Sequence, residues 1–252
     1  MFFLYRIHTF LFFNHQEKIS DKKIVWGKEW VENHHRLPPN KLFFKNWKYK
    51  KNSLITLVAF NGPILCSRLT SQALGSSQIK QLLYQWKDFS NHLDKNARDK
   101  LRIKTPPAYI DGRDVLDQKK LAHYFGNKNL LNDAKFIPVI KKSKIIICTY
   151  PQTTLSESIF SGIPTILLMK EELFEVIDLH NEVVDILKKA NIYHTCPKDA
   201  AKHINKIHND PLLWWNSDLC REAIHEFKKI CLTEHKKPIK AWSDFFIDFK
   251  NA

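Results

Sequence analysis

The stretch KIIICTYPQTTLSESIFSGIPTILL, residues 144–168, decides the fold. An apolar run ends at Cys148, a polar segment follows, and Gly162-Ile163-Pro164 leads into a second apolar run. Short, fully apolar runs of this kind are typical of strands buried in a parallel sheet. Gly162 suits a helix C-terminus, and Pro164 can precede a strand because no ladder N–H is needed there. The stretch therefore predicts a strand, a short helix from about 155 to 160, and a strand at 165–168.

The same alternation continues on both sides of this stretch. Strands are expected at 53–60 and 100–105, and an amphipathic helix between them at 76–93. Residues 108–134 are polar and predict loops, and a short helix with Pro138 in its first turn follows them. Further helices are predicted within 182–193, 197–210, 217–231 and 239–249, with Ser217 or Asp218 as a cap.

Strands that alternate with helices predict an α/β protein with a Rossmann-like parallel sheet and helices on both faces. Residues 1–52 are charged, rich in tryptophan and interrupted by Pro38-Pro39, so they predict an irregular leader. Residues 53–252 are expected to form the domain, closed by C-terminal helices.

The polar cluster at 149–157 has two interpretations. Thr154-Leu155-Ser156-Glu157 fits a capping box, in which threonine and glutamate satisfy free N–H groups of the helix. However, Thr149, Tyr150, Gln152 and Thr153 add more side-chain donors than a cap requires. The cluster also lies at the carboxyl end of a predicted parallel strand, where ligands bind in open α/β sheets and helix N-termini favour phosphate.

The composition limits the class of protein. The chain has 252 residues, 44% of them hydrophobic, and a net charge of +14, which favours anionic partners. The five cysteines show no metal-ligand spacing, which indicates free thiols in a reducing compartment. The apolar start MFFLYRIHTFLFF is too short to span a bilayer, so a cytoplasmic location is expected, with peripheral attachment to the inner face of the membrane left open.

Several motifs together resemble known families. The stretch at 141–168 resembles the nucleotide-sugar-binding motif in the C-terminal domain of GT-B glycosyltransferases. ISDKKIVWG at 19–27, ANIYHTCPKDAAKHINKIHNDPLLWWNS at 190–217 and REAIHEF at 221–227 occur in the same order as in a bacterial family of transferases from surface-carbohydrate gene clusters. The resemblance covers roughly residues 15 to 249, and HINKIHNDPLLWWNS is its most distinctive part.

This resemblance implies a glycosyltransferase-like enzyme of GT-B type with a nucleotide-diphosphate sugar as donor and no metal or other cofactor. By position, Thr153 and Thr154 would contact the donor phosphates, and Glu157 would hold ribose or sugar hydroxyls. Thr149 and Tyr150 would line the base or sugar side.

Two departures from the family pattern leave alternatives open. Only about fifteen unrelated-looking residues precede ISDKKIVWG, so the N-terminal acceptor domain is expected to be missing or to be a separate partner. LFEVIDL at 173–179 also lacks an expected arginine. The alternatives are transfer of a polyol phosphate from a CDP-alcohol, as in teichoic-acid-type polymerases, and a non-catalytic remnant or partner subunit.

Other candidate sites have competing structural interpretations. Asn61-Gly62 is either a ligand-facing loop or a plain turn, and Lys104 is either a diphosphate contact or a solvated strand end. Asp111-Gly112-Arg113-Asp114 predicts a turn rather than a metal site, and the dispersed histidines offer no catalytic base. Trp214-Trp215 favours packing over sugar stacking. The basic clusters at 45–51 and 234–240 lack a recognition motif, so nucleic acid is not an expected partner.

Overall fold

The computed structural model describes residues 18–39, 47–62, 74–105, 115–131, 135–173 and 181–251. Six parallel strands form its central sheet in the order β5-β4-β3-β6-β7-β8. Their bounds are Leu54–Val58 (β3), Leu101–Lys104 (β4), Leu130–Leu131 (β5), Ser143–Cys148 (β6), Thr165–Leu168 (β7) and Tyr193–His194 (β8). Relabelled from β3 as the first strand, this is the doubly wound order 3-2-1-4-5-6. The predicted Rossmann-like parallel sheet is therefore confirmed.

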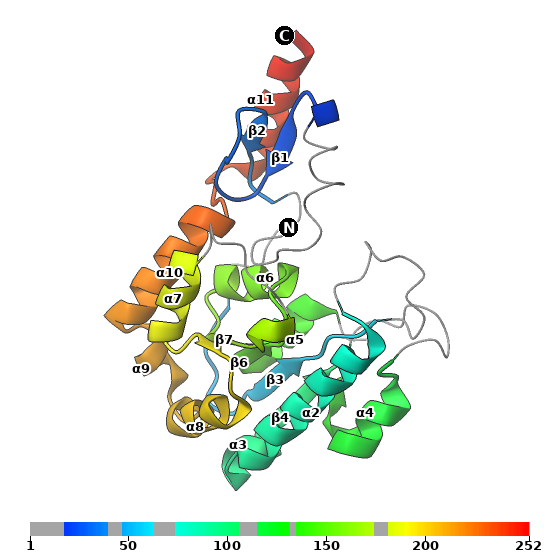
Figure 1. Ribbon diagram of the computed structural model, residues 1–252. Helices are drawn as coiled ribbons and strands as arrows, with labels where there is room; N and C mark the ends of the chain where they lie inside the picture. The colour runs from blue at the N-terminus through cyan, green and yellow to red at the C-terminus, as the bar shows by residue number, and fades with distance from the viewer. Residues whose placement is uncertain are drawn as a thin grey trace.

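Helices connect and flank these strands (Figure 1). They are Ser76–His92 (α2), Lys95–Lys100 (α3), Gln118–Phe125 (α4), Phe136–Lys142 (α5), Thr153–Ser161 (α6), Asn181–Lys189 (α7), Pro197–Ile207 (α8), Pro211–Trp215 (α9), Asp218–Cys231 (α10) and Pro238–Asn251 (α11). Crossover connections between parallel strands are almost always right-handed. Since the order reverses at β3 and β6, α2 and α4 cover one face of the sheet, and α5, α6 and α7 cover the other.

Helix α2 shows why the sequence pattern produces this core. Its apolar residues recur at helical spacing and are all buried, with exposed fractions of 0–4%: Ile79, Leu82, Leu83, Trp86 and Phe89. Each such side chain contributes about 1.5–3 kcal/mol when it is fully buried. The middle of β6, Ile145-Ile146-Ile147, is 0% exposed because sheet neighbours and helices enclose it on every side.

Two segments differ from the sequence predictions. Residues 108–134 were expected to be loops, but α4, the 3₁₀ turn Asn127–Asn129 and β5 lie within them. Asp117 begins α4 by accepting a hydrogen bond from the Lys120 amide at 2.7 Å. The leader also contains regular structure, because Lys23–Val25 (β1) and His34–Arg36 (β2) form a separate parallel pair.

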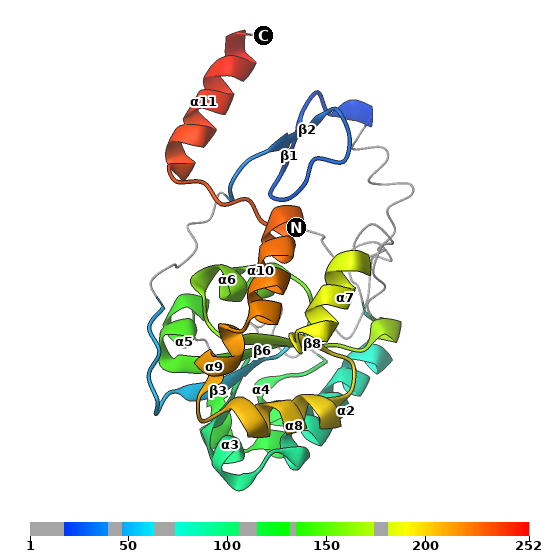
Figure 2. The same ribbon diagram turned by 90° about the vertical axis from the view of Figure 1, so that its left-hand side faces the viewer.

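The β1–β2 pair packs against the C-terminal end of the chain (Figure 2). The Lys28 amide donates to the Ile230 carbonyl at 2.9 Å, and the Thr233 hydroxyl donates to the Trp26 carbonyl at 2.6 Å. The indole of Trp242 in α11 donates to the Pro38 carbonyl at 2.9 Å. Segments from the two ends of the chain thus form one small unit above the sheet.

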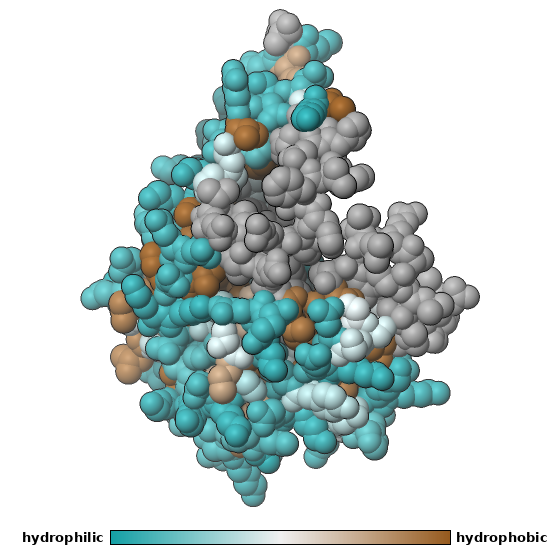
Figure 3. All heavy atoms as spheres, in the orientation of Figure 1, coloured by the Kyte–Doolittle hydropathy of each residue, from teal (hydrophilic) through white to brown (hydrophobic). Residues whose placement is uncertain are grey.

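The surface is mostly hydrophilic over the described residues of one face, with small groups of hydrophobic atoms (Figure 3). Within the described ranges, no helix has the length and apolar character needed to cross a bilayer.

Candidate functional site

The candidate site lies at the point where the strand order reverses. The chain leaves β3 towards one face of the sheet and leaves β6 towards the other, so their carboxyl ends flank the crevice in which open α/β sheets bind ligands. The predicted site residues follow three adjacent strands: Lys104 ends β4, Asn61 follows β3, and Thr149 and Tyr150 follow β6. Helix α6 begins directly after them. The structure therefore brings all seven predicted residues to one edge of the sheet, while their roles stay predictions.

Thr149 connects the two strands that border the crevice. Its hydroxyl donates to the Val58 carbonyl at 2.7 Å, and its side chain is 0% exposed. This bond fixes the end of β6 against the end of β3. The structure thus gives Thr149 a positioning role, and its contact with a ligand stays a prediction.

The N-terminus of α6 does not form the capping box that the sequence permits. The helix begins at Thr153 with Gln152 as N-cap, and no side chain bonds the cap amides. Thr154 and Glu157 therefore occupy the second and fifth helical positions, where the reciprocal bonds of a capping box cannot form. The capping interpretation is wrong because the helix starts earlier than expected.

Free donors remain at this helix end. Among the described residues, the amides of Thr153 and Thr154 meet no hydrogen-bond acceptor. The Thr154 hydroxyl oxygen is buried without a well-placed hydrogen-bond acceptor there, but it lies beside the Cys148 thiol, whose pKa it lowers against the larger effect of burial. Two amides without acceptors at a helix N-terminus form a group of donors suited to an anion.

Glu157 and Lys104 supply opposite charges close to these donors. Glu157 is 4% exposed and Lys104 is 9% exposed. Burial lowers the pKa of Lys104, whereas the neighbouring carboxylate of Glu157 raises it. The Lys104 ammonium also donates to the Thr105 carbonyl at 3.2 Å. A cation and a carboxylate thus lie together beneath the helix end, although their positions in the chain are 53 residues apart (157 − 104).

Asn61 and Tyr150 shape the rim of the crevice. The Asn61 side-chain carbonyl accepts a hydrogen bond from the Leu116 amide at 3.0 Å, which ties the loop after β3 to the segment before α4. Tyr150 packs edge-on against Phe60 with 5.1 Å between ring centroids. Phe60 was not predicted as a site residue; its position directly after a strand was the signal available in the sequence.

Other sequence candidates have structural roles where they are described. Burial raises the pKa of the Cys148 thiol to about 12, so it stays protonated near neutral pH and is a poor nucleophile. Trp214 donates to the Ala190 carbonyl at 2.9 Å, and Trp215 is 5% exposed, which agrees with packing. No group of three His, Cys, Asp or Glu side chains in the described ranges could hold a metal. Asp111-Gly112-Arg113-Asp114 lies outside the described residues.

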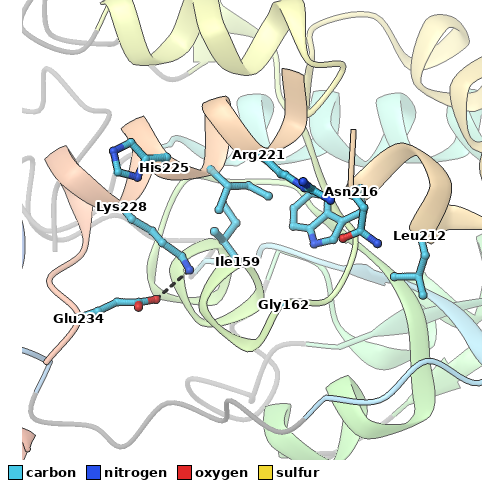
Figure 4. Close-up of a pocket in the computed structure, with 10 residues that line it drawn as sticks. Ile159, Gly162, Leu212, Asn216, Arg221, His225, Lys228 and Glu234 are labelled. Carbon is cyan, nitrogen blue, oxygen red and sulfur yellow. Dashed lines mark ion pairs between the residues drawn. The ribbon is translucent and has the colours of Figure 1, made fainter. Parts of the chain in front are cut away.

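A separate hollow lies between α6, α9 and α10 (Figure 4). Its volume is about 480 Å³, and Ile159, Trp215 and Ile224 provide its apolar lining. Lys228 pairs with Glu234 across one end at 2.8 Å. None of the predicted site residues lines this hollow.

The fold and this edge define a doubly wound α/β protein with a donor-rich helix N-terminus at its topological switch point. The chain belongs to the LIC12162 transferase family, whose family model matches residues 5–246. The resemblance to a transferase family is therefore confirmed. The match begins at residue 5, so most of the segment before Ile19 belongs to it rather than being unrelated.

Two solved structures are similar over most of this chain. One is WaaG, a glycosyltransferase involved in lipopolysaccharide biosynthesis, with 12% identity and a TM-score of 0.46 over 96% of this chain and 61% of that chain. The other is the glycotransferase of kitacinnamycin, with 12% identity and a TM-score of 0.39 over 85% of this chain and 51% of that chain. The chain thus spans less than two thirds of either protein. No curated protein matches the sequence.

Proposed function

We propose that this chain is the donor-binding part of a glycosyltransferase-like enzyme that uses a nucleotide-activated sugar in surface polysaccharide biosynthesis. The observation that carries the proposal is the group of donors at the start of α6. The amides of Thr153 and Thr154 lack acceptors among the described residues and lie at a switch point. A diphosphate supplies the acceptors and the negative charge that such a helix end favours.

The reaction would transfer a glycosyl group from a nucleoside diphosphate to an acceptor hydroxyl. The bond from the anomeric carbon to the diphosphate oxygen breaks, and the acceptor oxygen forms the new bond and releases its proton to water. The leaving diphosphate gains negative charge in the transition state. Donors that are already oriented stabilise this charge without reorganising, which is how the α6 amides would assist the reaction.

Each remaining residue has a role in this proposal that follows from its position. Lys104 would neutralise part of the diphosphate charge, and Glu157 would accept hydrogen bonds from ribose or sugar hydroxyls. Tyr150 would line the base or sugar side beside Phe60. Thr149 would hold the two strand ends in register through its bond to Val58.

Calorimetric titration tests the proposal. The purified chain would be titrated with UDP, GDP, CDP, their sugars and CDP-glycerol, beside Thr154→Ala and Glu157→Gln. We expect saturable binding of one nucleotide class and a loss of about ten- to a hundredfold in affinity in each variant, since one charge-assisted hydrogen bond contributes about 1.5–3 kcal/mol. Binding of CDP-glycerol alone would change the donor to a polyol phosphate.

Ser161→Ala provides the matched control. Ser161 lies at the other end of α6, is 3% exposed and donates to the Ser158 carbonyl at 2.7 Å. Its replacement should lower stability without changing nucleotide affinity. Absence of binding to every nucleotide, or equal binding by all four proteins, would contradict the proposed function.

A further inference from the structure

A second pocket lies on the opposite face of the sheet from α6, between α2 and α4. Its volume is about 500 Å³, which is within the range of sites that hold small ligands. Leu83, Val115 and Leu116 form its buried apolar floor. Around this floor stand lysine and tyrosine side chains from both helices.

The pocket has an excess of positive charge. Lys80, Lys119 and Lys120 line it, and Lys87 lies over the Tyr124 ring at 5.1 Å from the centroid. Asp117 is the nearby carboxylate, and it pairs with Lys120 at 3.8 Å. Lys80 and Lys119 are exposed and have no ion-pair partner among the described residues. Two ammonium groups are therefore available to an anion.

An exposed aromatic ring also lines the pocket. Tyr84 is 58% exposed and follows Lys80 by one helical turn, so both side chains lie on the same side of α2. Its ring offers a flat surface and its hydroxyl a polar tip. The surface over α2 and α4 is mostly hydrophilic with paler patches between (Figure 3).

The floor of this pocket is fixed to the candidate donor edge. The Val115 amide donates to the Gly62 carbonyl at 2.9 Å, and the Leu116 amide donates to the Asn61 side chain at 3.0 Å. Both bonds join the segment before α4 to the loop that follows β3. The pocket therefore adjoins the carboxyl edge rather than the far edge of the sheet.

We propose that this pocket binds an anionic saccharide, in which a phosphate or carboxylate contacts Lys80 and Lys119 while a sugar ring lies against Tyr84. This binding site is inferred from the geometry of the pocket and does not depend on the proposed function. A sugar of one or two rings matches the volume, and a single anionic group matches the two available ammonium groups.

Binding to the full chain tests this inference. The probes are glucose 6-phosphate, galacturonic acid, glucose, inorganic phosphate and a single-stranded oligonucleotide. We expect saturable binding of at least one anionic sugar, stronger than that of glucose or phosphate. The phosphorylated and carboxylated probes distinguish the two sources of negative charge.

The variants separate a site from general surface charge. Lys80→Gln with Lys119→Gln should weaken binding of the anionic sugar about tenfold, since both ammonium groups that contact the anion are lost. Lys95→Gln with Lys198→Gln removes the same charge from exposed positions elsewhere and should have no effect. Tyr84→Ala should weaken sugar binding but not phosphate binding, and Tyr84→Phe should retain most of it.

Several outcomes would overturn the inference: equal losses in the two lysine pairs, equal binding of glucose and its phosphate, no saturable binding, or preference for the oligonucleotide. Nucleotide titration of the same variants keeps the two proposals distinguishable. The pocket variants should bind nucleotide normally, and Thr154→Ala should bind the anionic sugar normally.

Discussion

Lys104 at the end of β4 and Glu157 in α6 lie close enough for the carboxylate to raise the pKa of the ammonium group against the effect of burial. Strand β3 lies between β4 and β6 in the sheet. The interaction between Lys104 and Glu157 therefore joins residues from the two sides of the switch point. Burial of both residues strengthens this interaction because water screens buried charges weakly. The carboxyl edge therefore holds an ordered arrangement of charge before any ligand enters.

Glu157→Gln removes the negative charge from this arrangement. The pKa of Lys104 should fall further below its ordinary value of 10.5. Between the native pKa of Lys104 and 10.5, the unfolded chain binds a proton that the native chain has released, so the free energy of unfolding rises with pH there. This pH interval should be wider in Glu157→Gln than in the unaltered chain. NMR titration of ¹³C-methylated lysines, assigned with Lys104→Arg, measures this shift. Glu172→Gln is the charge-matched control, and an unchanged pKa in Glu157→Gln would refute the prediction.

Thr149→Val removes the hydroxyl that bonds Val58. The Val58 carbonyl then loses a partner in a buried position, which costs about 1–3 kcal/mol. Nucleotide affinity should also fall, because the ends of β3 and β6 are no longer held together. Chemical denaturation and calorimetry measure the two effects.

Thr165→Val is the control for that substitution. Thr165 is 0% exposed and donates to the Ile163 carbonyl at 2.8 Å, at the opposite edge of the sheet. It should lower stability by a similar amount and leave nucleotide affinity unchanged. Equal losses of affinity in both variants would mean that stability alone governs binding.

The sequence predicted those parts of the fold whose signal is local. The apolar runs of β6 and β7 and the spacing in α2 specified those elements, and Ser217 caps α10 as expected, accepting from the Cys220 amide at 3.4 Å. Strand β5 was missed because a strand of two residues is too short to show an alternating apolar pattern. It is recognised as a strand only through its pairing with β4. The pocket between α2 and α4 was also missed, because Lys80 and Lys119 meet only through tertiary packing.

The candidate site shows the same division. Its residue types could be identified because they follow strands, and the parallel sheet brings strand ends to one edge. The start of α6 could not be predicted, because Thr154-Leu155-Ser156-Glu157 fits the sequence pattern of a capping box. In the structure Gln152 is the N-cap instead: its backbone is extended, and the helix begins at the next residue. The bond from Thr149 to Val58 depends on strand order, which the sequence left open.

Gly27→Ala should disturb the contact between the leader and α10. A Cβ atom at Gly27 would lie 2.1 Å from the Ile230 carbonyl oxygen, which is backbone and cannot move aside. Overpacking of this kind costs about 1–3 kcal/mol. We expect a lower melting temperature and faster proteolysis within residues 18–39. Gly75→Ala is the control, because the nearest atom to its Cβ would be 3.6 Å away; equal behaviour of the two variants would contradict the prediction.

Acid should destabilise the protein through His203. Burial lowers the pKa of His203 to about 4, with smaller contributions from His194 and Lys206, and its Nε2 atom has no hydrogen-bond partner among the described residues. Its ordinary pKa is 6.5, so between pH 6.5 and about 4 the unfolded chain binds a proton that the native chain excludes. The free energy of unfolding should therefore decrease as the pH falls through this interval. In His203→Leu the slope of the free energy of unfolding against pH should decrease in this interval, by an amount that corresponds to the uptake of up to one proton on unfolding. The control is Ile204→Val, which does not titrate and should lower the free energy of unfolding by about 1 kcal/mol at every pH without altering its slope. An unchanged slope in His203→Leu would assign the acid sensitivity to other groups.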